Sequence, residues 1–115
     1  MFETFKVDLA ESGLDMLFEP YQTEIMHLLW SGGEWNTASV WKTLRLRGIR
    51  ASRPYPVSRA SVINFMARMA EEGILEYTEK TGKGGHQRVY TACITEGTMW
   101  QILANTLAKK LKEVE

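Results

Sequence analysis

The sequence predicts a mainly helical α+β fold in which three helices are followed by a β-hairpin and a further helix. Its 115 residues, 44% of them hydrophobic, fit a single domain with a substantial core. Three segments before residue 73 repeat apolar residues at helical spacing, and glycine follows each of them at Gly32, Gly48 and Gly73. Two segments rich in β-branched and aromatic residues then flank a glycine-rich turn, which indicates a hairpin.

Residues 1–17 are expected to be an arm of undefined structure. Apolar and charged residues alternate over 5–9 as in a short strand, but Ser12 and Gly13 interrupt the pattern. The first helix is predicted from Pro20, a residue that suits the first helical turn, as far as Gly32. Its predicted buried face consists of Tyr21, Ile25, Leu28 and Leu29.

The second helix is predicted from a cap at Asn36 or Thr37 to Gly48, and the third from a cap at Ser58 to Gly73. Between them lies a basic connector whose two prolines favour extended backbone. The predicted inward residues are Ala38, Trp41 and Leu44 in the second helix and Val62, Phe65, Met66 and Met69 in the third.

The hairpin is predicted to pair residues 74–78 with residues 88–92 around a basic tip. A last helix is expected from Thr95 or Glu96, and its apolar stripe either packs on its own domain or joins two chains. A stripe this broad favours the dimer. The predicted dimerisation residues are Met99, Trp100, Leu103, Leu107 and Leu111.

Three helices followed by a two-stranded wing are the order of a winged helix-turn-helix domain, here predicted over residues 18–93, with residues 94–115 as a C-terminal dimerisation helix. The charges support a nucleic-acid partner although the net charge is zero. Residues 1–34 hold seven acids against Lys6 alone, whereas residues 35–70 hold seven cations and no acid. A local basic surface of this kind is what binding to phosphates requires.

The outward face of the third helix carries Arg59, Ser61, Asn64 and Arg68. Guanidinium groups pair with guanine edges or phosphates, and an asparagine amide matches an adenine edge. Ile63 is either a core residue or a contact to a thymine methyl group. The wing is expected to contact the DNA backbone. The predicted DNA-binding residues are Lys42, Arg53, Ser58, Arg59, Ser61, Asn64, Arg68, Lys80, Lys83, His86 and Arg88.

Three segments of the sequence are similar to a known family. They are residues 18–30, with Glu24-Ile25-Met26 and a final Trp30, residues 37–41, and residues 61–75. In this order they resemble the opening helix, the second helix, and the recognition helix with the first wing strand of penicillinase repressors of the BlaI/MecI type. The resemblance implies a dimeric repressor with an N-terminal winged helix domain and interlocking C-terminal helices. The basic connector, the long wing and the arm depart from the family pattern and indicate a diverged member.

The sequence therefore predicts a cytoplasmic, sequence-specific regulator of transcription that binds a pseudo-palindromic operator in double-stranded DNA as a homodimer and acts as a repressor. Two other interpretations stay open. A winged helix can serve as a protein-interaction module, because a fold alone does not fix a function. It can also bind DNA without sequence preference, as chromatin-like proteins do, and would then depend little on Asn64.

Other classes of function find no support in the sequence. Two distant histidines and one cysteine provide neither a catalytic constellation nor a set of metal ligands, so we expect no enzyme, metal or cofactor. No apolar run is long enough for a membrane span, and no export signal is visible. Cys93 is expected to be a small buried side chain that forms no disulfide within the chain.

Overall fold

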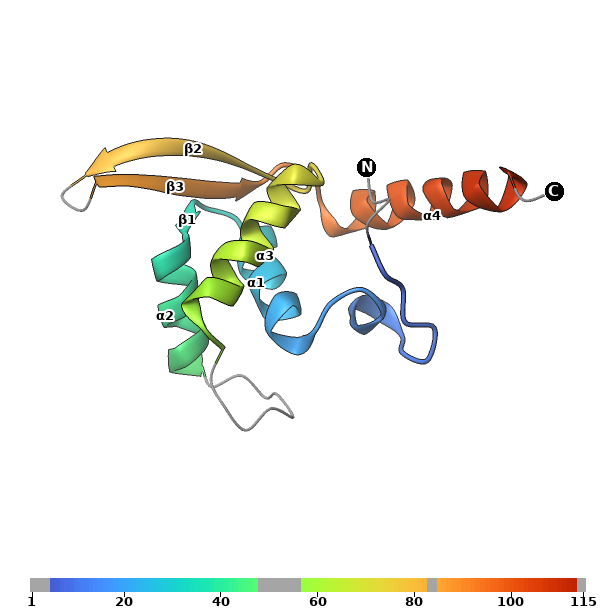
Figure 1. The fold of residues 1–115 in the computed structure, drawn as a ribbon, viewed down its shortest axis with the longest axis horizontal. Coiled ribbons are helices and arrows are strands. Elements are labelled where there is room, and N and C mark those ends of the chain that lie inside the picture. The colour runs from blue at the N-terminus through green and yellow to red at the C-terminus, as the bar shows by residue number, and fades with distance from the viewer. Residues whose placement is uncertain (1–4, 48–56, 83–84, 114–115) are drawn as a thin grey trace.

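A computed structural model describes residues 5–47, 57–82 and 85–113. The fold is α+β and mainly helical, with a three-stranded antiparallel sheet whose hairpin projects as a wing to one side and a last helix that extends to the other side (Figure 1). The elements, in chain order, are a short 3-10 helix η1 (Gly13–Met16), α1 (Pro20–Trp30), β1 (Trp35–Asn36), α2 (Thr37–Arg47), α3 (Arg59–Glu71), β2 (Leu75–Gly82), β3 (Gly85–Ala92) and α4 (Glu96–Glu113).

The first two helices begin where the sequence predicts. At the start of α1 the Glu19 carboxylate accepts a hydrogen bond from the third helical N–H, and the Gln22 side chain accepts one from the Glu19 N–H at 2.9 Å. This reciprocal pair is a capping box. At α2 the Asn36 side chain accepts a hydrogen bond from the Ser39 N–H at 2.7 Å. Local hydrogen bonds therefore determine both starting points, which is why the sequence reveals them.

The ends of α3 also follow the prediction. The Ser58 hydroxyl accepts a hydrogen bond from the Ser61 N–H at 3.1 Å and caps the helix. After the helix, Gly73 adopts a φ of 82°, a left-handed conformation that favours glycine, and the Ile74 N–H donates to the Met69 carbonyl at 3.0 Å. This turn directs the chain from α3 straight into β2.

The sheet has the order β1-β3-β2. Both hairpin strands are longer than the predicted segments, because pairing continues from Leu75 with Ala92 out to Gly82 with Gly85. The outer half of the wing is exposed, so its sequence needs no apolar alternation and the pattern stops before the strands do. The sequence also gives no sign of β1, because a strand of two residues is too short to show a pattern.

The core lies among the four helices and the base of the sheet, where Leu75 and Tyr90 are its buried residues, and the predicted inward faces of α1 and α3 are buried in it. The prediction for α2 was partly wrong. Val40 and Leu44 are its buried residues, whereas Ala38 and Trp41 are only half-buried. The Trp41 indole N–H donates to the Val57 carbonyl at 3.1 Å, so this ring lies at the edge of the core, where its polar atom finds a partner.

The arm packs against the domain but contains no strand over residues 5–9. Phe5 makes an edge-on contact with Phe18, with ring centroids 6.1 Å apart, and Phe18 makes another with Phe65 of α3 at 5.6 Å. The Asp8 N–H donates to the Met16 carbonyl at 2.8 Å and closes the loop before η1. Phe5 is thus held by an aromatic contact, without pairing in a sheet, whereas Leu9 is 86% exposed.

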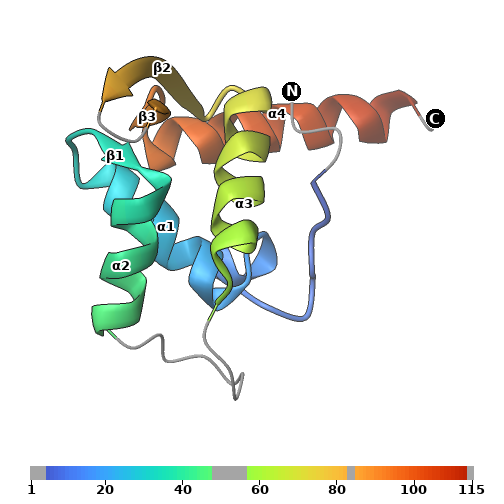
Figure 2. The same ribbon diagram turned by 60° about the vertical axis from the view of Figure 1, so that its left-hand side comes forward.

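The apolar stripe of α4 is divided between two environments. Met99 and Leu103, in the first half of the helix, are buried in the core of the same chain. Leu107 and Leu111 are 43% and 70% exposed, in the half of α4 that extends away from the rest of the fold (Figures 1 and 2). The predicted dimerisation residues therefore do not form one free surface.

Candidate nucleic-acid interface

The exposed face of α3 is the centre of the candidate interface. Val62, Phe65, Met66 and Met69 all point into the core, so the helix presents its opposite side to solvent. Figure 2 shows α3 at the front of the molecule with α2 beside it. Arg59, Asn64 and Arg68 are exposed, and the first acid of the helix is Glu71 at its end. This face therefore offers hydrogen-bond donors and positive charge along most of its length.

Arg68 is positioned by the ring beneath it. Its guanidinium carbon lies 5.7 Å from the centre of the Phe65 ring, a cation–π contact that keeps the long side chain along the surface of α3. Asn64 lies one turn earlier. Both residues line a shallow cavity of 260 Å³ between α1 and α3. The other lining residues are Tyr21, Gln22, Ser61 and Phe65.

The two serines at the start of α3 bind each other. The hydroxyls of Ser58 and Ser61 lie 2.9 Å apart, and Ser58 is also the helix cap. Each hydroxyl has one donor and two acceptor sites, so one mutual hydrogen bond leaves capacity for a further partner. Ser58 thus has a structural role in addition to the predicted contact with DNA.

A second group of cations lies on α2. Lys42, Arg45 and Arg47 are all exposed, and the Arg45 guanidinium lies 4.7 Å from the centre of the Trp41 ring. Arg45 and Arg47 are absent from the predicted set of binding residues, although they belong to the basic middle third of the sequence. Residues 35–70 hold seven cations and no acid, and this charge pattern is the signal that could have added Arg45 and Arg47 to the predicted set.

The wing carries cations that already have partners. The Lys80 amine lies 3.0 Å from the Glu34 carboxylate, in a pair whose side chains are 57% and 59% exposed. Arg88 lies 4.0 Å from Glu79, and its guanidinium carbon is 4.3 Å from the centre of the Tyr77 ring. The wing is therefore less basic toward a ligand than its sequence indicates, because neighbouring carboxylates offset part of its charge.

The pKa of Arg88 is raised chiefly by a hydrogen bond to Tyr90 and by the nearby Tyr77. Like any arginine, this side chain is cationic at all ordinary pH values. His86 is exposed near the tip of the wing. Two predicted contacts, Arg53 and Lys83, lie outside the described residues.

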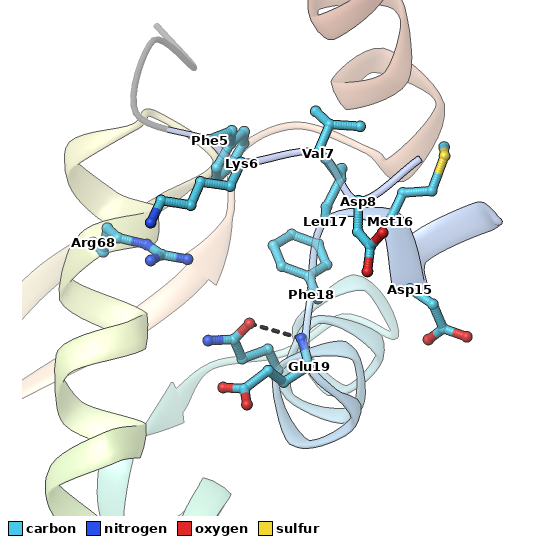
Figure 3. Close-up of a pocket in the computed structure, with 11 residues that line it drawn as sticks. Phe5, Lys6, Val7, Asp8, Asp15, Met16, Leu17, Phe18, Glu19 and Arg68 are labelled. Atoms are coloured by element: carbon cyan, nitrogen blue, oxygen red, sulfur yellow. Dashed lines mark hydrogen bonds between the residues drawn. The ribbon is translucent and has the colours of Figure 1, made fainter. Parts of the chain in front are cut away.

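A larger cavity of 460 Å³ lies beside α3, between the arm, η1 and the start of α1 (Figure 3). Phe18 lies in the middle of the lining residues, with Lys6 and Arg68 on one side and Asp8 and Asp15 on the other. Arg68 lines this cavity as well as the shallower one beside Asn64. The arm therefore borders the candidate interface, a position that the sequence does not indicate.

Cys93 is exposed, contrary to the prediction that it is buried. Its thiol donates a hydrogen bond to the Gly73 carbonyl at 2.9 Å. In the described part of the chain, no three His, Cys, Asp or Glu side chains come together as they would to hold a metal ion. None of the described helices is both long and apolar enough to span a membrane.

The arrangement of α1, α2 and α3, followed by the β2–β3 hairpin, is a winged helix-turn-helix fold. Solved structures of transcription regulators resemble it. One is a protein from Methanosarcina mazei described as a possible transcriptional regulator, with a TM-score of 0.55 and 17% identity, covering 85% of this chain and 80% of that one.

Two further neighbours are PadR family transcription regulators. The one from Eggerthella lenta has a TM-score of 0.50 and 19% identity, covering 77% of this chain and 81% of that one. The one from Clostridium difficile has a TM-score of 0.50 and 14% identity, covering 82% of this chain and 93% of that one. No protein-family model and no curated protein matches this sequence. The resemblance to penicillinase repressors stays a prediction.

Proposed function

We propose that this protein is a cytoplasmic transcription regulator that binds a specific sequence of double-stranded DNA, with α3 in the major groove and the wing along the backbone. The exposed face of α3 is the observation that carries the proposal, because it holds Arg59, Asn64 and Arg68 and no acid before Glu71. The regulators among the structural neighbours support the same assignment.

The chemistry of that face suits a major groove. An α-helix fits this groove, where every base pair presents its own pattern of donors and acceptors. Asn64 offers an amide that both donates and accepts, while the guanidinium groups of Arg59 and Arg68 suit guanine edges or phosphates. Lys42, Arg45 and Arg47 add backbone contacts, which position the protein without selecting a sequence.

We further propose that two chains associate through the exposed half of α4. Leu107 and Leu111 are 43% and 70% exposed and lie on the half of α4 that extends from the fold. A two-fold dimer would bury this stripe against the same stripe of the partner and would match a pseudo-palindromic operator. Met99 and Leu103 are not part of this surface, because they are already buried.

In the decisive experiment, the purified protein selects bound duplexes from a pool of random sequence. Its affinity for the most enriched duplex is then measured at increasing salt concentrations. We expect an enriched palindrome whose half-sites are about 10 base pairs, or a multiple, apart. Asn64→Ala should reduce discrimination between sites by about 1–3 kcal/mol, whereas Lys42→Ala should weaken binding to all sequences alike. Asn105→Ala on α4 is the matched control and should change neither.

Two results would favour the other interpretations. Tight binding without an enriched sequence would indicate a chromatin-like protein. No binding at moderate salt would indicate a protein-interaction module.

The dimer is tested by sedimentation of the variant Leu107→Glu, which should be monomeric. Asn105→Glu adds the same charge two residues earlier, about 200° around the helix, and should stay dimeric. A wild-type protein that sediments as a monomer at micromolar concentration would contradict the proposed association.

The sign of regulation follows from the resemblance to penicillinase repressors, and we propose repression. A reporter gene placed behind the selected operator should be expressed less when the protein is present. Higher expression would identify an activator and would leave the DNA-binding proposal intact.

A further inference from the structure

Ile63 is an aliphatic side chain on the outward face of α3. It is 42% exposed, while its neighbours Val62 and Phe65 are buried, so the structure decides against the core position that the sequence left open. One exposed apolar residue is ordinary on a protein surface. The residues that surround Ile63 on the helix indicate what this exposed side chain contacts.

Ile63 belongs to a stripe formed by Ala60, Ile63, Asn64 and Ala67, at the i, i+3, i+4 and i+7 spacing that places residues on one face. Ala60 is exposed and Ala67 half-buried, and neither has a side chain beyond the methyl group. A helix with short side chains at these positions can lie close to base edges. The four residues of the stripe include no cation. Arg59 and Arg68, the two cations of α3, lie beside the stripe.

This stripe matches the edges of A·T pairs. In the major groove only thymine offers a methyl group, which apolar side chains contact, and adenine offers the donor and acceptor that fit an asparagine amide. Guanine is most often bound by arginine or lysine, and the stripe has neither. The chemistry of its centre therefore favours adenine and thymine over guanine and cytosine.

We propose that α3 recognises adjacent A·T pairs in each half-site, with Ile63 against the C5 methyl of a thymine and Asn64 bound to an adenine. This inference rests on the proposed function, since it requires α3 to lie in a major groove. It specifies what that function leaves open, namely the base composition at the centre of the half-site and the group that each side chain contacts.

The test uses the duplex selected above, in which each thymine is replaced in turn by deoxyuridine. This change removes the C5 methyl group and keeps the base pair. At one thymine of the half-site, the wild-type protein should lose about fourfold in affinity, the value of burying one methyl-sized group. Ile63→Ala should lose a similar factor on the thymine duplex and show no further loss on the deoxyuridine duplex.

A parallel substitution tests Asn64. Replacing adenine by 7-deazaadenine removes the N7 acceptor, and the wild-type protein should lose about tenfold in affinity at one adenine next to that thymine. Asn64→Ala should be insensitive to this replacement. Leu46→Ala, which truncates an exposed apolar residue on α2, is the control and should keep the full sensitivity to both modified bases.

The outcomes separate the inference from the proposed function. If a sequence is enriched but no thymine shows the loss, or if the loss persists in Ile63→Ala, the inference is overturned while sequence-specific binding stands. If no duplex is bound, both are overturned. Because Ile63 is 42% exposed, Ile63→Ala should lose only a small part of the stability of the wild type. Binding is therefore compared at a temperature where thermal unfolding shows that both proteins are folded, which excludes a folding defect as the cause of weaker binding.

Discussion

Replacing Phe18 with alanine should destabilise the whole domain by about 3–5 kcal/mol, the usual cost of removing a buried phenylalanine ring. Phe18 is 4% exposed and lies between Phe5 of the arm and Phe65 of α3, with ring centroids 6.1 Å and 5.6 Å away. Each aromatic pair contributes about 0.5–1.5 kcal/mol beyond the burial itself. Since small domains are stable by about 5–15 kcal/mol in total, this loss is large.

Phe5 decides whether the arm truly packs on the domain. It is half-buried, so Phe5→Ala should destabilise the protein by about 1 kcal/mol, roughly half the value of a fully buried ring. Because the two rings touch, the effects of Phe5→Ala and Phe18→Ala should not add. We expect a coupling free energy of about 1 kcal/mol between them.

The assay is urea unfolding followed by the fluorescence of the four tryptophans, with the free energy extrapolated to water. Tyr77→Ala on the wing is the control. Tyr77 does not belong to the Phe5–Phe18–Phe65 cluster, so its effect should add to that of Phe18→Ala within about 0.5 kcal/mol. If the effects of Phe5→Ala and Phe18→Ala also add within that error, the arm is not packed on Phe18 and the reasoning fails.

Three further predictions concern single sites. Ser58→Ala removes the cap of α3 and should destabilise the protein by about 1 kcal/mol in the same urea assay, and an unchanged midpoint would contradict the capping role. Although Cys93 is an exposed residue, its neighbours partly desolvate the thiol, and this desolvation together with the charge of Glu76 raises the pKa of Cys93. Less thiolate is therefore present at neutral pH, and iodoacetamide should react more slowly than with the urea-unfolded chain. Glu76→Gln should lower that pKa and speed the reaction, and equal rates would refute the electrostatic effect. Glu34→Gln removes the partner of Lys80, so DNA affinity at low salt should rise while stability changes by less than about 1 kcal/mol, and the gain should vanish at high salt.

The starts of α1, α2 and α3 and the end of α3 could be predicted because their signals are local, whereas the predicted stop of the second helix at Gly48 lies outside the described residues. The Ser58 cap, the Asn36 cap and the turn at Gly73 each involve residues within a few positions of one another, so the sequence alone contains both partners. The same holds for the inward faces of α1 and α3, where the 3.6-residue period selects one side of the helix. The basic middle third is likewise a property of the sequence and needs no structure.

Contacts between distant segments could not be predicted in this way. Lys80 and Glu34 are 46 residues apart, and their pairing depends on how the wing sits beside the loop after α1. Phe5 of the arm likewise packs on Phe18, and Phe18 in turn packs on Phe65 of α3, which is far along the chain. A pattern of apolar residues predicts that a face is buried but not which segment covers it. The ion pairs that offset the charge of the wing and the packing of the arm are therefore known only from the tertiary structure.

Two helices show where this division lies. The sequence determined that α3 has an outward face with Asn64 and that α4 has one continuous apolar stripe. Only the tertiary structure decided that Ile63 is exposed beside Asn64, and that Met99 and Leu103 are buried while Leu107 and Leu111 stay accessible. The physical reason is the same for both helices: periodicity fixes which residues share a face, whereas burial depends on where each helix ends relative to the core that it packs on.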